Sequence, residues 1–160
     1  MKITCQPFDD EVEHSTEVLK CISLDLWGKA RTQSQGGAWY MGLIVDQATG
    51  TPTPFFTLLK HTEVILDGLK TVLMCAETQT GKKAKVIHID KGREWDNTLF
   101  AEFYAICGLT IEWIPKDSSA ANEQVECSNH TIIEGCCMMI KDSSLGKEWW
   151  AEAAAAYCYI

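Results

Sequence analysis

Three acidic residues occupy positions from which they could act together. Asp25 lies inside a short apolar run, Asp90 directly follows a run of mostly β-branched residues, and Glu126 lies early in a segment of helical periodicity. Clustered carboxylates repel one another and resist ionisation unless cations share the site. Oxygen ligands of this kind suit Mg²⁺ or Mn²⁺, and two such ions can stabilise the attacking and leaving oxygens of a phosphoryl transfer. The candidate chemistry is therefore metal-dependent cleavage or joining of phosphodiesters.

The pattern of acidic residues alone leaves a plainer alternative open. The chain has 22 Asp and Glu residues, and so many carboxylates supply some suggestive triplet by chance. Asp46, at the end of another apolar run, illustrates this, because we interpret it as a solvated strand end rather than as part of the site. His88, two residues before Asp90, could orient a carboxylate, but a packed core histidine is the favoured interpretation.

Hydrophobic periodicity predicts the elements that must position these residues. Short apolar runs between turn residues predict strands, and apolar residues three and four positions apart predict helices. The predicted strands cover 22–27, 39–45, 55–59, 84–89 and 109–114, and the predicted helices run from 62, from 99, from about 119 and from 147. The order β-β-β-α-β-α-β-α-α is typical of an α/β fold with a five-stranded mixed sheet and helices packed on its faces. If the first and fourth strands are neighbours, Asp25 and Asp90 can meet.

The totals indicate one domain with an unusual charge. A length of 160 residues favours a single domain, which we place at 21–160 after an acidic lead-in at 1–20. The net charge of −8 opposes DNA binding, because contacts with phosphates require Lys and Arg. It is the main compositional evidence against a nucleic-acid enzyme.

The eight cysteines show no zinc-ligand spacing and are interpreted as buried free thiols in a reducing compartment. The acidic start is unlike a secretory signal, and no apolar stretch approaches the roughly 20 residues that span a bilayer. We therefore expect an intracellular protein without a membrane partner.

Several short motifs, in order, resemble the integrase catalytic core of copia-type long-terminal-repeat retrotransposons, especially fungal ones. The family's "D-L-W-G", "G-G-x-x-Y", "Q-T-G-K-K", "D-x-G-x-E", "N-G-x-x-E-R-x-N-R-T" and "F-W-A-E-A" are matched, wholly or in part, at 25–28, 36–40, 79–83, 90–94, 122–131 and 149–153. Positions 91 to 125 place 35 residues between Asp90 and Glu126, which is the family's interval. Each motif alone is weak, whereas their order and this interval are specific.

The resemblance implies an RNase H-like fold that carries out 3′-end processing of element DNA and strand transfer into target DNA. It implies that Asp25, Asp90 and Glu126 are the catalytic residues and the ligands of two Mg²⁺ or Mn²⁺ ions. It also implies a homodimer or higher oligomer that acts in the nucleus or in a cytoplasmic virus-like particle. Lys91, Lys116, Asn122 and Asn129 are the candidate DNA contacts.

Departures from the family pattern weaken the expected DNA contacts. Cys127 and His130 stand where the family has Arg, and Glu123 replaces a glycine. The chain also starts after the family's His/Cys region and stops before a basic C-terminal part, which predicts a C-terminally truncated core.

Three functions remain open from the sequence: a strand-transfer enzyme, a related nuclease that cuts without joining, and a decayed or domesticated remnant that acts, if at all, as a nucleic-acid- or protein-binding module.

Overall fold

The computed structural model describes residues 15–90, 95–114 and 119–159, with the side chains of 119–123 left out. A five-stranded mixed sheet forms the centre, as predicted, with the strand order β3-β2-β1-β4-β5. The strands are β1 (Cys21–Gly28), β2 (Tyr40–Asp46), β3 (Pro52–Thr57), β4 (Val86–Asp90) and β5 (Thr110–Ile114). The helices are α1 (Thr62–Thr80), α2 (Thr98–Cys107), α3 (Ser119–Ser143) and α4 (Trp150–Tyr159), with a 3-10 turn, η1 (Lys147–Trp149), before α4.

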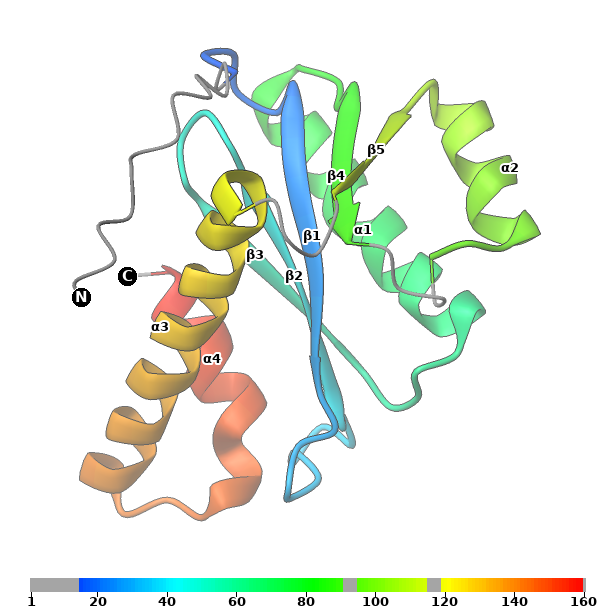
Figure 1. Ribbon diagram of the computed structural model, residues 1–160. Helices are drawn as coiled ribbons and strands as arrows, with labels where there is room; N and C mark the ends of the chain where they lie inside the picture. Colours follow the sequence, from blue (N-terminus) through cyan, green and yellow to red (C-terminus); the bar gives the residue numbers. More distant parts are fainter. Residues whose placement is uncertain (1–14, 91–94, 115–118, 160) are drawn as a thin grey trace, which may run out of the picture.

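The first three strands form an antiparallel meander, and β4 and β5 add to β1 in parallel. Parallel neighbours need a crossover connection, and α1 and α2 supply the crossovers (Figure 1). The prediction that the first and fourth strands are neighbours is confirmed, because Leu24 of β1 pairs with Ile89 of β4.

The helices cover both faces of the sheet, and each face has its own hydrophobic core (Figure 1). Ile22 and Leu24 of β1 point into the core under α1 and α2, with Ile87 and Ile89 of β4. Successive strand residues point to opposite faces, so the odd-numbered residues of β1 face α3 and α4. Trp27 accordingly packs with the core on that side.

Sequence signals explain how several elements end. Gly81 and Gly108 have positive φ values of 66° and 67° at the ends of α1 and α2, a left-handed conformation that glycine adopts without a side-chain penalty. The third strand was predicted at 55–59 but covers Pro52–Thr57. Proline lacks the N–H that a central strand needs, which argued against a strand there, but β3 lies at the sheet edge and tolerates it.

Two other expectations are answered by the fold. All described cysteines are free, but the expectation that they are buried is wrong for four of them: Cys75, Cys107, Cys127 and Cys137. None of the helices formed by the described residues is both long and apolar enough to cross a bilayer.

Phe55 of β3 packs against two glycines, one on the neighbouring strand β2 and one on the helix α1. A Cβ atom built on Gly42 of β2 would lie 2.0 Å from Phe55 Cζ, and one built on Gly68 of α1 would lie 2.4 Å from Phe55 Cδ2. Phe55 is itself buried. The close approach of α1 to the sheet therefore depends on the absence of side chains at both positions.

Gly42→Ala is expected to lower the free energy of unfolding by about 1–3 kcal/mol, the usual cost of overpacking a core. Urea denaturation of the wild type and the variant would measure this. Gly36→Ala is the matched control, because a Cβ at Gly36 would have its nearest neighbour 3.7 Å away, and we expect a change within about 0.5 kcal/mol. Equal effects of the two substitutions would contradict the packing argument.

Candidate active site

The pairing of β1 with β4 places two predicted site residues at neighbouring positions. Leu24 is paired with Ile89, and Asp25 and Asp90 are the next residues of the two parallel strands. Because the flanking residues Leu24 and Ile89 point into the core under α1 and α2, Asp25 and Asp90 belong to the opposite face, which α3 covers. The backbone thus brings these two aspartates to one side of the sheet.

Two hydrogen-bond donors from the described part of the chain contact the Asp25 carboxylate. The backbone N–H of Leu26 donates to Asp25 Oδ1 at 2.8 Å, and the side-chain amide of Asn129, from α3, donates to Asp25 Oδ2. Hydrogen bonds to a carboxylate favour its ionised form. Together they give the Asp25 carboxylate a fixed orientation between β1 and α3.

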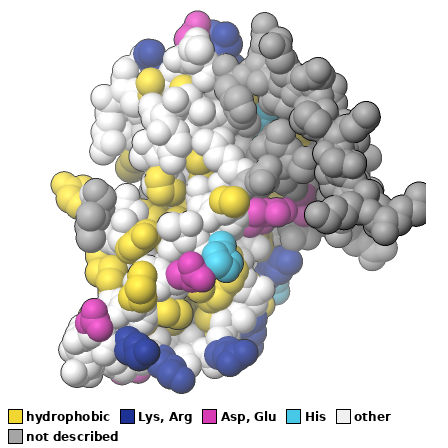
Figure 2. Space-filling model, turned by 60° about the vertical axis from the view of Figure 1, so that its left-hand side comes forward, with side chains coloured by type: hydrophobic (Ala, Val, Ile, Leu, Met, Phe, Trp, Pro, Cys, Tyr) yellow, Lys and Arg dark blue, Asp and Glu magenta, His cyan; other side chains and the backbone are white. Residues whose placement is uncertain are grey.

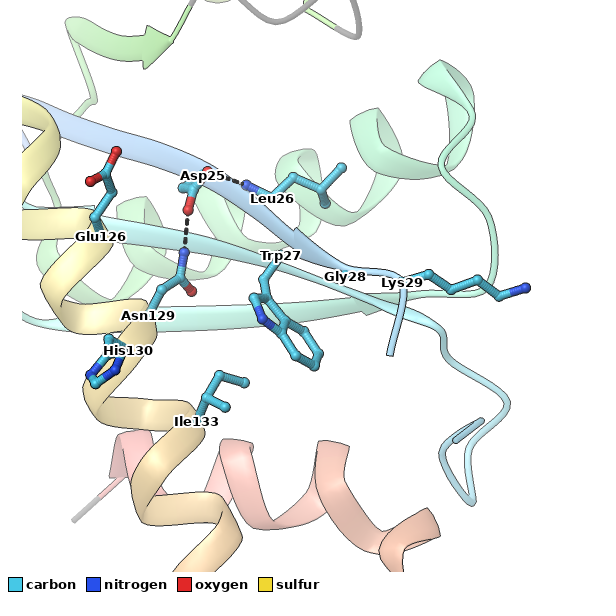
Figure 3. A pocket seen from close by; sticks show the side chains of 9 residues that line it. All are labelled: Asp25, Leu26, Trp27, Gly28, Lys29, Glu126, Asn129, His130 and Ile133. Carbon is cyan, nitrogen blue, oxygen red and sulfur yellow. Dashed lines mark hydrogen bonds between the residues drawn. The ribbon is translucent and has the colours of Figure 1, made fainter. Parts of the chain in front are cut away.

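A pocket of about 480 Å³ lies beside this carboxylate, and both Asp25 and Glu126 line it. Figure 3 shows Glu126 on the first turns of α3 and Asp25 on the facing strand. Glu126 is exposed and Asp25 is half-buried, so solvent and ligands can reach both. Among the described residues, the lining consists of Asp25, Leu26, Trp27, Gly28, Lys29, Glu126, Asn129, His130 and Ile133.

Asp90 is half-buried at the end of β4 and does not line this pocket. Among residues 15–90, 95–114 and 119–159, no three Asp, Glu, His or Cys side chains lie close enough together to hold a metal ion. The structure therefore brings Asp25 and Glu126 to one pocket and Asp90 to the adjacent strand, and the assignment of all three as metal ligands stays a prediction. The donor set of carboxylates fits a hard divalent cation.

The four predicted DNA contacts fall in different places. Lys91 and Lys116 lie outside the described residues, and Asn122 lies on α3 where only the backbone is described. Asn129 is only 6% exposed, and its amide donates to Asp25. Its contact with DNA stays a prediction, but the structure gives this side chain a partner inside the protein.

Six residues of the pocket lining were not predicted as site residues: Leu26, Trp27, Gly28, Lys29, His130 and Ile133. Lys29 is the one Lys or Arg of the pocket lining, and its Nζ also lies 4.4 Å from the ring centroid of Trp39. The sequence signal was present but differently interpreted, since Lys29 was noted only as a replacement for the family's proline. Trp27 packs edge-to-face against Trp150 of α4, with ring centroids 5.5 Å apart.

A buried polar network lies on the same sheet face, two residues before Asp25 and Asp90. Gln47 Nε2 donates to Ser23 Oγ at 3.2 Å and lies 2.7 Å from His88 Nδ1. With Nδ1 as the acceptor, the ring proton is on Nε2, which donates to Glu112 at 2.6 Å. His88 is therefore a packed, hydrogen-bonded histidine, in agreement with the favoured interpretation.

Two further polar residues of this region are inert or structural. Cys21 Sγ lies 3.5 Å from His88 Nε2, but burial, with Glu112 and Asp46 nearby, raises the pKa of the Cys21 thiol to about 12. It is therefore protonated at neutral pH and a poor nucleophile. Asp46 was expected to be solvated, which is wrong: it is 7% exposed and accepts from the Leu19 N–H and the Thr49 hydroxyl.

Among the residues that the structure describes, the α3 and α4 side of the molecule carries few Lys and Arg side chains near the pocket. Figure 2 shows hydrophobic side chains gathered across the middle of this face, while the Lys and Arg side chains lie towards its edges. On α3, His130 pairs with Glu134 at 3.5 Å, which places another acid beside it. This distribution agrees with the net charge of −8.

The arrangement of the sheet and the helices is that of an α/β fold of the RNase H-like class. A chain of the simian T-cell lymphotropic virus intasome, solved in complex with PP2A regulatory subunit B56 gamma, superposes with a TM-score of 0.74. The superposition covers 96% of this chain and 53% of that chain at 12% sequence identity. The predicted fold class is thereby confirmed.

The chain is homologous to Pol polyproteins of transposons, which confirms the resemblance recognised in the sequence. It is 26% identical over 153 residues to the retrovirus-related Pol polyprotein from transposon TNT 1-94 of Nicotiana tabacum. It is 23% identical over 141 residues to the truncated transposon Ty1-A Gag-Pol polyprotein of Saccharomyces cerevisiae. These matches cover 96% and 88% of this chain but only 11% and 12% of the relatives, so the chain spans about a tenth of their length. No protein-family model matches the chain.

Gln47→Leu is expected to lower the free energy of unfolding by about 1–3 kcal/mol, because Ser23 and His88 would lose a buried hydrogen-bond donor. Thermal or urea denaturation at neutral pH would measure the loss. Gln33→Leu is the matched control, since Gln33 Nε2 makes only an exposed hydrogen bond to the Gly37 carbonyl. Equal free energies of unfolding for the two variants would show that the buried network does not stabilise the fold.

Proposed function

We propose that this chain is the catalytic core of a retrotransposon integrase that processes 3′ ends of element DNA and transfers them into target DNA. The observation that carries the proposal is the pocket shared by Asp25 and Glu126, which come from distant parts of the chain. Asp90 lies on the strand paired with β1, one residue beyond the Leu24–Ile89 pair. Homology to transposon Pol polyproteins supports the same activity.

Asp25, Asp90 and Glu126 are the proposed ligands of two Mg²⁺ or Mn²⁺ ions. Two such ions about 3.5–4 Å apart stabilise the attacking and leaving oxygens of an in-line displacement at phosphorus. The chain's own contribution is to position the ligand oxygens: the Leu26 N–H and the Asn129 amide orient the Asp25 carboxylate. Such a reaction needs no covalent enzyme intermediate.

The proposed partners are DNA and further copies of the chain. Lys29, which lines the pocket beside Trp27, can contact a phosphate of the bound strand as well as the ring of Trp39. Lys91, Lys116 and Asn122 remain candidate DNA contacts. An integrase would act inside the cell, in the nucleus or in a virus-like particle.

A second candidate function is favoured by the charge. A net charge of −8 and the presence of Cys127 and His130 where the resembled family has Arg weaken the electrostatic attraction for DNA. A decayed or domesticated integrase remnant would have this surface. It would act, if at all, as a binding module without metal-dependent chemistry.

A strand-transfer assay with Mn²⁺ separates these functions. We expect joined products from the wild type, and a loss of about 10²-fold or more in Asp25→Asn and Glu126→Gln, the scale for removing a stabiliser of transition-state charge. Glu134→Gln is the matched control: it is another exposed glutamate of α3 but is paired with His130 and does not line the pocket. Cut but unjoined DNA would indicate a nuclease, and inactive wild type would indicate the remnant.

Metal binding can be tested without DNA. A divalent ion that binds only the folded state at 100 times its dissociation constant stabilises it by about 2.7 kcal/mol, which corresponds to roughly 5–10 °C for a domain of this size. We expect Mn²⁺ to raise the melting temperature of the wild type, chelation to reverse the rise, and Asp90→Asn to abolish it. An unchanged rise in Asp90→Asn would remove Asp90 from the ligand set.

A further inference from the structure

Asn129 is a buried amide in the lining of the candidate site. It lies on α3 three residues after Glu126, lines the same pocket, and is 6% exposed. Its Nδ2 donates to Asp25 Oδ2, whereas its buried Oδ1 has no hydrogen-bond partner among the described residues.

The buried Oδ1 without a partner indicates that this amide does not serve the stability of the fold alone. A buried polar atom without a partner costs about 1–3 kcal/mol, and such atoms call for an explanation. An apolar side chain of similar size would fill the same space between α3 and β1 without that cost. The hydrogen bond that the amide makes among the described residues is with Asp25. The function of the amide therefore concerns the Asp25 carboxylate.

The contact also fixes the geometry between two elements. Residues three apart on a helix share a face, so Glu126 and Asn129 lie on the same face of α3. Both line the pocket between α3 and β1. Figure 3 shows the amide of Asn129 reaching the Asp25 carboxylate from the turn that follows Glu126. One hydrogen bond therefore sets the position of the Asp25 carboxylate relative to the helix that carries Glu126.

We propose that Asn129 is a positioning residue, which orients the Asp25 carboxylate and ties it to the α3 turn that presents Glu126. This inference rests on the proposed function, because it treats Asp25 and Glu126 as ligands of one metal centre. The proposed role of Asn129 is thus a contact with Asp25 inside the protein, in place of the predicted contact with DNA. The Leu26 N–H donates to one oxygen of Asp25 and the Asn129 amide donates to the other, so removing the amide takes away the donor that links this carboxylate to α3.

The test measures Mn²⁺ binding by electron paramagnetic resonance, without DNA, together with the melting temperature in chelator. Asn129→Leu keeps the volume and removes the donor; Asn129→Ala is the second variant if the first does not fold. We expect the dissociation constant for Mn²⁺ to rise about 10–100-fold, the usual effect of removing a partner that orients a metal ligand. The metal-free melting temperature should stay the same or rise, because a buried unpaired oxygen is also removed.

Ser128→Ala is the matched control. Ser128 is the preceding residue of α3, and its hydroxyl bonds only to the Gln124 carbonyl of the same helix. Its substitution should leave Mn²⁺ binding unchanged. If Ser128→Ala weakened Mn²⁺ binding as much as Asn129→Leu, a general disturbance of α3 would explain both results and the positioning role would fail.

A double-mutant cycle decides whether Asn129 acts through Asp25. Adding Asn129→Leu to Asp25→Asn, measured at the higher Mn²⁺ concentrations that this chain needs, should cause no further loss. Adding it to Glu126→Gln should still weaken binding. An equal loss in the Asp25→Asn background, or wild-type affinity in Asn129→Leu, would overturn the positioning role and leave the proposed function intact. A wild type that binds no Mn²⁺ would instead overturn the proposed function and this inference with it.

Discussion

The register between β1 and β4 is the constraint on which the site depends. Side chains alternate across a strand, so a slip of one residue would move every side chain to the other face. Ile22 and Leu24 are 1% and 2% exposed in the core under α1 and α2, and such a slip would move them out of this core and place Asp25 in it. The apolar residues of β1 thus specify the register, and the register places Asp25 beside Asp90. The burial of apolar side chains under α1 and α2 therefore fixes the face of the sheet on which Asp25 and Asp90 lie.

Glu126 and Asn129 of the candidate site lie on the helix α3 rather than on the sheet. The helix α4 packs against α3 and fixes its position. A Cβ atom at Gly135 of α3 would lie 2.1 Å from the ring of Tyr157, so the two helices approach closely at this point. Trp150 of α4 is anchored by its Nε1–H to the Thr32 carbonyl at 2.9 Å and by Trp27. The packing of α3 on α4 therefore contributes to where Glu126 lies, although α4 supplies no residue to the pocket.

Local patterns in the sequence were sufficient for the order of the elements, for the mixed sheet and for the ends of α1 and α2 at Gly81 and Gly108. Boundaries failed where position in the sheet mattered, as in β3, because a proline run cannot reveal that its strand lies at an edge. The contact of Asn129 with Asp25 joins residues 104 positions apart, and nothing in either neighbourhood predicts it. The same is true of Asp46, whose burial follows from the donors Leu19 and Thr49 folding around it.

The proposed metal site and the proposed DNA-binding surface depend on different parts of the fold. The orientation of Asp25 depends on a central strand and on the buried Asn129, whereas phosphate contacts depend on exposed positions such as Cys127 and His130 of α3. Loss of exposed basic residues therefore weakens binding to DNA without disturbing the carboxylates. Since affinity from phosphate contacts falls steeply with salt, an acidic core with an intact pocket would retain its chemistry at low ionic strength and lose DNA first as salt increases. The net charge of −8 therefore bears on the affinity for DNA and not on the geometry of the carboxylates.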